Sequence, residues 1–148
     1  MNETIEYLTR RGILLPSQHV STTVFGNSPE LSEALIDLIK RGIKRAGSSL
    51  LWSFEFENEP IPSVSDCEIV LNHHDQPVVV TRITNVRTLP FQDVPEQYAA
   101  LEGEGDLSLS YWRSVHWKFF SQECKRIGRE PHTTMPVVCN EFEVLHVL

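Results

Sequence analysis

The sequence has few of the features that mark disulfide-rich, secreted or membrane proteins. Its three cysteines, Cys67, Cys124 and Cys139, lie far apart, and no Cys-x-x-Cys pair occurs. This excludes a zinc knuckle or a disulfide framework and favours buried thiols in a reducing compartment. No stretch approaches the ~20 apolar residues of a membrane span, and the first residues are polar and acidic rather than a secretion signal. We therefore expect a cytoplasmic protein without membrane association.

Common catalytic and metal-binding motifs are also missing. The sequence contains no Gly-x-Ser-x-Gly, P-loop, His-Glu-x-x-His or Gly-x-Gly-x-x-Gly pattern. The run His73-His74-Asp75 offers metal-binding side chains, but it lies in an expected hairpin turn without a third ligand at useful spacing. We predict no metal and no cofactor.

The overall balance of residues is that of an ordinary folded domain, with an excess of acid. The chain has 148 residues, of which 41% are apolar and 22% charged, and its formal net charge is −7. We expect one domain over residues 1–148, with a helix and loop at 1–23 packed on it as an extension. Nucleic-acid affinity depends largely on Lys and Arg contacts to phosphate, so any such contact here must be local.

Helices are predicted at residues 5–11, 29–41, 95–100 and about 107–127. The second of these is the best marked, because Ser28 is a good N-cap, Pro29 suits the first helical position, and Gly42 follows as a C-terminal cap residue. Gly12 and Gly128 end the first and last helices in the same way.

Strands are predicted at residues 50–57, 67–71, 77–86 and 136–144. Residues 72–76 between the second and third strands form a predicted hairpin turn, and residues 14–25 a loop. Strands do not alternate regularly with crossover helices, so a doubly wound nucleotide-binding fold is not expected. The pattern predicts an α+β fold, with a small, mostly antiparallel sheet or barrel and helices packed against it.

A basic turn follows the second helix. Four of the ten residues from 40 to 49 are basic, namely Lys40, Arg41, Lys44 and Arg45. Lys44 emerges between helix and strand, where its compact cation suits the polarisation of a carbonyl or the binding of a phosphate. Ser48 and Ser49 supply hydroxyls nearby. The alternative interpretation is a helix C-terminus carrying solvated cations.

An acidic, glycine-containing turn is the second candidate feature. It runs from Glu102 to Asp106 as Glu-Gly-Glu-Gly-Asp. If Glu104 faces Lys44, the two side chains supply a base and a cation to one site. The alternative is that these acidic residues only precede the next helix, because the helix dipole favours negative charge near a helix N-terminus.

Two aromatic residues, Trp52 and Tyr111, flank these motifs. Aromatic side chains stack on nucleic-acid bases, and they also fill protein cores. The sequence leaves both roles open for these two residues.

These features together resemble ASCH-domain proteins, in particular the bacterial stand-alone group. The run from Gly42 to Trp52 is similar to the G-x-K-T-x-T-x-S signature of that family. Also similar are the acidic turn at 102–106, the segment Ser110-Tyr111-Trp112-Arg113, the pair His116-Trp117 and the ending from Met135. The likeness covers roughly residues 24–146. It implies a PUA-like fold, a small β-barrel with flanking helices and a cleft beside the signature, that handles RNA or a nucleoside.

The resemblance also implies roles for residues. In members that hydrolyse N4-acetylcytidine, a Lys and a Thr of the signature act with a downstream Glu, and these correspond to Lys44, Gly47 and Glu104. Gly47 lacks the Thr hydroxyl, and Ser48 points to the opposite face of a strand unless a bulge intervenes. Arg45 replaces another Thr of the signature.

Two hypotheses follow. The first is a hydrolase of a modified nucleoside or of RNA, with Lys44, Glu104 and Ser48 as catalytic residues. The second is a non-catalytic module that binds RNA or a nucleotide. In either case the expected ligand-binding residues are Lys40, Arg41, Arg45, Ser49, Trp52, Tyr111 and Arg113.

Overall fold

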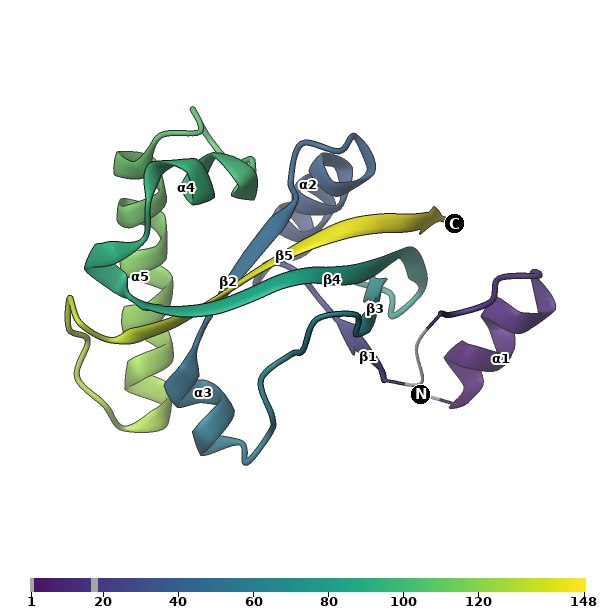
Figure 1. The fold of residues 1–148 in the computed structure, drawn as a ribbon, viewed down its shortest axis with the longest axis horizontal. Helices are drawn as coiled ribbons and strands as arrows, with labels where there is room; N and C mark the ends of the chain where they lie inside the picture. Colours follow the sequence, from purple (N-terminus) through teal and green to yellow (C-terminus); the bar gives the residue numbers. More distant parts are fainter. Residues whose placement is uncertain (1, 17–18) are drawn as a thin grey trace.

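The computed structural model describes residues 2–16 and 19–148, which form an α+β fold of one sheet with flanking helices (Figure 1). The helices are α1 (Asn2–Arg10), α2 (Pro29–Lys40), α3 (Leu51–Phe56), α4 (Glu96–Glu102) and α5 (Leu109–Ile127), with a 3-10 turn η1 (Phe91–Asp93). The strands are β1 (Val20–Thr23), β2 (Ala46–Leu50), β3 (Cys67–Leu71), β4 (Pro77–Pro90) and β5 (Pro136–Val147).

The five strands form one mixed sheet in the order β1-β3-β4-β5-β2. β1 pairs with β3 in parallel, and the other neighbours are antiparallel, as the sequence predicts. The sheet is open rather than closed into the expected barrel, because β1 and β2 lie at its two edges and do not pair with each other in the described residues.

The prediction of a strand at residues 50–57 is wrong. The strand is β2, which ends at Leu50, and the chain continues as helix α3. Leu50 pairs with Val137, one residue from the start of β5, so a longer β2 would have no partner strand. The polar–apolar alternation that suggested a strand belongs to a short helix that is half-buried over residues 51–54 and exposed at its end, where Phe56 is 58% exposed.

The other predicted elements are found; the strand predicted at 67–71 has the expected ends as β3, and the rest begin or end at different residues. The hairpin turn at residues 72–76 joins β3 to β4 as predicted, and β4 and β5 extend beyond the expected residues. The expected loop at 14–25 contains β1, a strand that sequence patterning missed. Residues 17 and 18 of that loop lie outside the described residues.

Helices cover the sheet on separate faces and build separate parts of the core. Side chains of α4 and α5, including Tyr98, Trp112 and Phe120, pack with residues of β2 and β5. Ile36 and Ile39 of α2 pack with a different set of sheet residues. All three cysteines are buried, as the sequence suggested.

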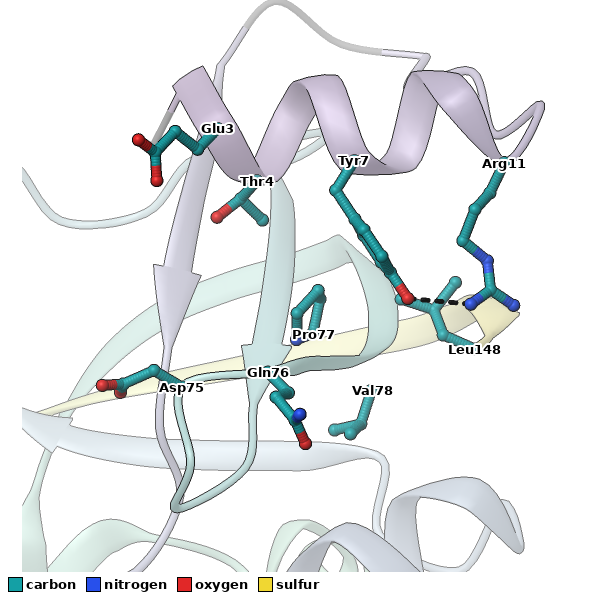
Figure 2. A pocket seen from close by; sticks show the side chains of 9 residues that line it. All are labelled: Glu3, Thr4, Tyr7, Arg11, Asp75, Gln76, Pro77, Val78 and Leu148. Carbon is teal, nitrogen blue, oxygen red and sulfur yellow. Dashed lines mark hydrogen bonds between the residues drawn. The ribbon is translucent and has the colours of Figure 1, made fainter.

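Helix α1 packs at the end of the molecule opposite α4 and α5 (Figure 1). Its Leu8 is fully buried against Ile69 and Val80. Between α1 and the β3–β4 hairpin lies a hollow of about 490 Å³, in which Arg11 donates a 2.8 Å hydrogen bond to the Tyr7 hydroxyl (Figure 2). None of the described helices combines the length and apolar character that crossing a membrane requires.

Candidate functional site

Lys44 is positioned by the end of α2. Gly42 adopts a left-handed φ of +75°, and the N–H groups of Ile43 and Lys44 both donate to the carbonyl of Leu38. Lys44 therefore precedes β2 instead of lying within it, and its side chain folds back so that Nζ donates to the Ala46 carbonyl at 2.8 Å. Only 2% of this side chain is exposed.

Two carboxylates hold the buried ammonium group. Lys44 Nζ lies 3.2 Å from Glu104 Oε2 and 3.3 Å from Glu102 Oε1. The structure thus brings Lys44 and Glu104 together and adds Glu102, to which the sequence assigned no role. A buried charge is costly unless it is paired, so these carboxylates account for the burial of Lys44.

Glu102 is the centre of the cluster. Its Oε1 accepts from Lys44 and lies 3.4 Å from His116 Nε2, while its Oε2 accepts from Ser48 Oγ and Trp112 Nε1, both at 2.5 Å. These four donors use the acceptor capacity of both oxygens. Burial alone would raise the pKa of Glu102, but the hydrogen bond from His116 and the charge of Lys44 outweigh it and lower the pKa to about 2.

Glu102 is the functional candidate that sequence reasoning missed. The sequence places Glu102 in the acidic turn, whereas in the structure it is the last residue of α4 and lies on the buried face of that helix with Tyr98 and Ala99. The spacing of these three residues is helical, so the available signal was an acidic residue on an apolar helix face.

His116 of α5 completes the cluster. Its ring stacks on Trp112, with centroids 4.3 Å apart, and Nδ1 lies 2.9 Å from the Trp112 carbonyl oxygen. Burial alone would lower the pKa of His116, but the hydrogen bond and charge of Glu102 outweigh it and raise the pKa above the ordinary value.

Ser48 reaches the cluster without a bulge, so the expectation that it needs one is wrong. β2 pairs with β5 in continuous register from Ala46 to Leu50. Side chains within a strand alternate between its two faces, but Lys44 lies before β2 and does not follow this alternation. Lys44 and Ser48 can therefore both contact Glu102. Ser48 Oγ is also 3.0 Å from the Tyr98 hydroxyl.

Gly47 faces the other side of β2. A Cβ built there would lie 3.6 Å from the Phe25 ring and 3.7 Å from Asn140 Oδ1, which are ordinary contacts. Lys44 Nζ is 5.6 Å from the centre of the same Phe25 ring. A threonine at position 47 would therefore be directed toward the Phe25 side of Lys44.

The glycines of the acidic turn let it approach its neighbours closely. Gly103 has a φ of +73°, and a Cβ there would lie 2.6 Å from the Ile43 carbonyl oxygen. At Gly105, with a φ of +60°, a Cβ would lie 2.5 Å from the Tyr111 ring. The turn thus holds Glu104 against the Lys44 segment and packs beside Tyr111, which is 39% exposed.

The remaining basic residues of the expected ligand-binding set lie on the surface. Lys40, Arg41 and Arg45 are exposed, and Arg41 pairs with Asp37 at 3.4 Å. Arg113 donates to the Gln92 carbonyl at 3.2 Å and so contacts the η1 segment.

Trp52 and Ser49 lie toward the other end of β2, where α3 begins (Figure 1). The Arg129 guanidinium lies 4.6 Å from the centre of the Trp52 ring. Ser49 lines a second hollow, of about 160 Å³, beside Phe54 and Phe119. Neither this hollow nor the one beside α1 is lined by Lys44.

The cluster also has the composition of a possible metal site. One ligand atom each from Glu102, Glu104 and His116 lies within 4.8 Å of the others. The Lys44 ammonium already lies on both carboxylates, so an ion would have to displace it. We therefore assign no metal to this cluster.

The fold and the site define an α+β domain with a buried lysine, held by two glutamates, where a helix leads into an edge strand. The chain belongs to the ASCH domain family, whose model matches residues 21–146. Comparison with curated proteins found no match.

Solved structures are similar over most of the chain. An ASCH domain from Lactobacillus crispatus is 34% identical, with a TM-score of 0.86, over 97% of this chain and 92% of that one. Protein EF3133 from Enterococcus faecalis is 29% identical, with a TM-score of 0.83, over 99% and 91% of the two chains. The hypothetical protein PH0355, at 18% identity and a TM-score of 0.52 over 85% and 97% of the two chains, shares the fold.

Proposed function

We propose that the protein binds RNA or a modified nucleoside or nucleotide beside Lys44, and that it hydrolyses an acylated base such as N4-acetylcytidine. The observation that carries this proposal is the 3.2 Å contact between Lys44 Nζ and Glu104 Oε2. A cation and a carboxylate at this distance supply an electrophile and a base to one substrate. Membership of the ASCH family, with its PUA-like, RNA-binding type of fold, supports a nucleoside-containing ligand.

The reaction follows from these two side chains. Lys44 donates to the acyl oxygen, and Glu104 takes a proton from a water molecule whose oxygen attacks the acyl carbon. Glu104 then returns the proton to the base nitrogen as the carbon–nitrogen bond breaks. The products are the amino base and acetic acid, which releases its proton to water and becomes acetate. Ser48, hydrogen-bonded to Glu102 in the same cluster, holds the attacking water. If Ser48 Oγ is the nucleophile instead, Glu104 takes its proton and passes it to the leaving nitrogen, and a water molecule then hydrolyses the acyl-serine to acetic acid and free serine.

A second candidate function is binding without catalysis. It is favoured by Gly47, which lacks the hydroxyl of the family signature, and by the 2% exposure of the Lys44 side chain. In this case Lys40, Arg41 and Arg45 contact phosphate, while Tyr111 stacks on a base.

Purified protein incubated with N4-acetylcytidine or with a short RNA distinguishes these functions. Chromatography measures cytidine or cleaved RNA. We expect deacetylation that falls about 10²–10⁴-fold in Glu104→Gln and is also lost in Lys44→Ala. Lys125→Ala, an exposed cation on α5, is the matched control and retains the rate.

Gly47→Thr supplies the missing signature hydroxyl at a position with room for its Cβ. A higher rate in this variant would support the hydrolase. Binding without turnover, both in the natural sequence and in Gly47→Thr, would establish the non-catalytic module instead. RNA cleavage without deacetylation would identify a ribonuclease.

A further inference from the structure

Both ring nitrogens of His116 face groups that can only accept a hydrogen bond. Nδ1 lies 2.9 Å from the Trp112 carbonyl oxygen, and Nε2 lies 3.4 Å from Glu102 Oε1. A neutral imidazole carries one N–H, so either neutral tautomer would direct a nitrogen lone pair at an oxygen. Only the doubly protonated imidazolium donates to both groups.

The charge of the cluster gives an independent reason for the same state. Lys44 is a cation, while Glu102 and Glu104 are carboxylates, so these three groups together carry one negative charge. A protonated His116 makes the group of four neutral. Burying a net charge is costly, which favours the neutral arrangement.

The charged groups around His116 are the two glutamates and Lys44, whose ammonium contacts the same oxygen of Glu102 as His116 does. Glu102 comes from α4, and Glu104 from the turn that follows it. On its own helix, the rings of Trp112 and Phe120 lie 4.3 and 5.6 Å from the His116 ring centre. His116 therefore lies against aromatic rings of its own helix and has the glutamates on one side.

The two glutamates differ in their capacity to exchange a proton. Glu102 accepts from four donors and is 2% exposed. Glu104 contacts Lys44 through one oxygen, and 17% of its side chain is exposed. A further proton on Glu102 would displace an existing donor, whereas Glu104 has acceptor capacity to spare.

We propose that His116 is a protonated positioning residue that keeps Glu102 ionised beside Lys44. Glu104 is then the carboxylate that exchanges a proton with the ligand. The protonation of His116 rests on its hydrogen-bond geometry and on the charge of the cluster, and it does not depend on the proposed hydrolase function. The division of roles between the glutamates rests on the proposed hydrolase function.

Nuclear magnetic resonance of the imidazole nitrogens in the unmodified protein tests the first part directly. We expect both His116 nitrogens to carry protons at neutral pH, with a titration midpoint above the ordinary 6.5. The signal is assigned by its loss in His116→Gln. Glu102→Gln removes the negative partner, so it should lower the midpoint. A neutral tautomer at pH 7, or a midpoint below 6.5, would overturn the proposal.

The pH profile of deacetylation tests the second part. His116→Gln keeps a side-chain donor but removes the charge, so we expect kcat to fall at least about tenfold, by loss of roughly 1.4 kcal/mol or more of transition-state stabilisation. KM should change little, and the alkaline limb due to His116 should disappear. An unchanged alkaline limb would contradict the positioning role. Absence of turnover in the unmodified protein would refute the hydrolase and the division of roles, while the nitrogen spectrum would still decide the protonation of His116.

Discussion

At the scale of single residues, the molecule concentrates charge in one buried place. The chain carries a net charge of −7, yet its buried lysine and its most deeply buried glutamate contact each other. Desolvation of such groups opposes folding, and only mutual attraction and complete hydrogen bonding offset it. The cluster therefore makes the fold dependent on each of its members.

Removal of the Lys44 charge should leave Glu102 and Glu104 without the ammonium group that both of them contact, so that only His116 offsets their charge. We expect Lys44→Met to lower the free energy of unfolding by about 3–5 kcal/mol. Urea denaturation followed by circular dichroism measures this. Lys125→Met on the exposed surface of α5 is the control and should change stability by less than about 0.5 kcal/mol. Equal effects of the two substitutions would show that the Lys44 contacts do not stabilise the fold.

The Glu102 carboxylate should make the free energy of unfolding depend on pH in the acid range. Its pKa is about 2 in the folded protein, against an ordinary value of 4.5. A depressed pKa contributes stability that is present above pH 4.5 and is lost as the pH falls toward 2. The contribution is on the order of 3 kcal/mol. Urea denaturation at a series of pH values should show this loss, and Glu102→Gln should flatten the curve in that interval. The same slope in both proteins would refute the assignment.

At the scale of elements, the site depends on how α4, the acidic turn and α5 meet the end of α2. The turn lies against the backbone of residues 43 and 44 because Gly103 has no side chain. Ser108 caps α5 by accepting a hydrogen bond from the Tyr111 N–H at 3.0 Å. The orientation of Trp112 and His116 therefore depends on where α5 begins.

Gly103→Ala and Gly42→Ala form a matched pair. Both glycines have left-handed φ values, of +73° and +75°, but only at Gly103 would a Cβ meet other atoms. We expect Gly42→Ala to lower the free energy of unfolding by about 1–2 kcal/mol, because alanine is strained in the left-handed conformation. Gly103→Ala should lower it by about 3–4 kcal/mol, because a steric clash is added to that strain. Thermal unfolding compares them. Equal costs would mean that the turn can move away from Ile43.

Ser108→Ala removes the side-chain cap of α5. We expect a loss of about 1 kcal/mol in the free energy of unfolding. Ser114→Ala, at an exposed position within the same helix, should be neutral or slightly stabilising, because alanine has the higher helix propensity. Chemical denaturation of both variants distinguishes loss of the cap from a general effect of removing a hydroxyl.

At the scale of the whole molecule, the acidic net charge favours a small ligand for the proposed function. Three exposed cations, Lys40, Arg41 and Arg45, lie near the site, within a strongly acidic protein. Extended RNA needs many Lys and Arg contacts to phosphate along its length, and a net charge of −7 disfavours them. A nucleoside or nucleotide places its charge in one spot and suits a local group of cations.

The salt dependence of RNA binding tests this preference for a small ligand. With three cations available, a short single-stranded RNA should show a slope of log affinity against log salt no steeper than about −2. Fluorescence anisotropy at several salt concentrations measures the slope, and Arg45→Ala should reduce it by about 0.7. A slope of about −5 or steeper would reveal a long phosphate-binding track.

The sequence alone determined the fold class, the long helices and the position of Lys44. These follow from local rules, because caps such as Ser28 and glycines such as Gly42 and Gly128 act on the residues next to them. The run of β-branched residues that predicts β4 likewise acts locally. The motifs that identify the ASCH family are also local, so they can be recognised from the sequence alone.

Only the tertiary structure decided where β2 ends, that Glu102 is the centre of the site, and that Ser48 and His116 share it. The end of β2 depends on where β5 begins, which lies more than eighty residues further along the chain. Glu102 owes its depressed pKa to donors from β2 and α5 and to Lys44. Burial and hydrogen bonding between distant segments are collective properties, so the turn at Gly42 and Lys44 acquires its chemistry only when α4 and α5 pack against it.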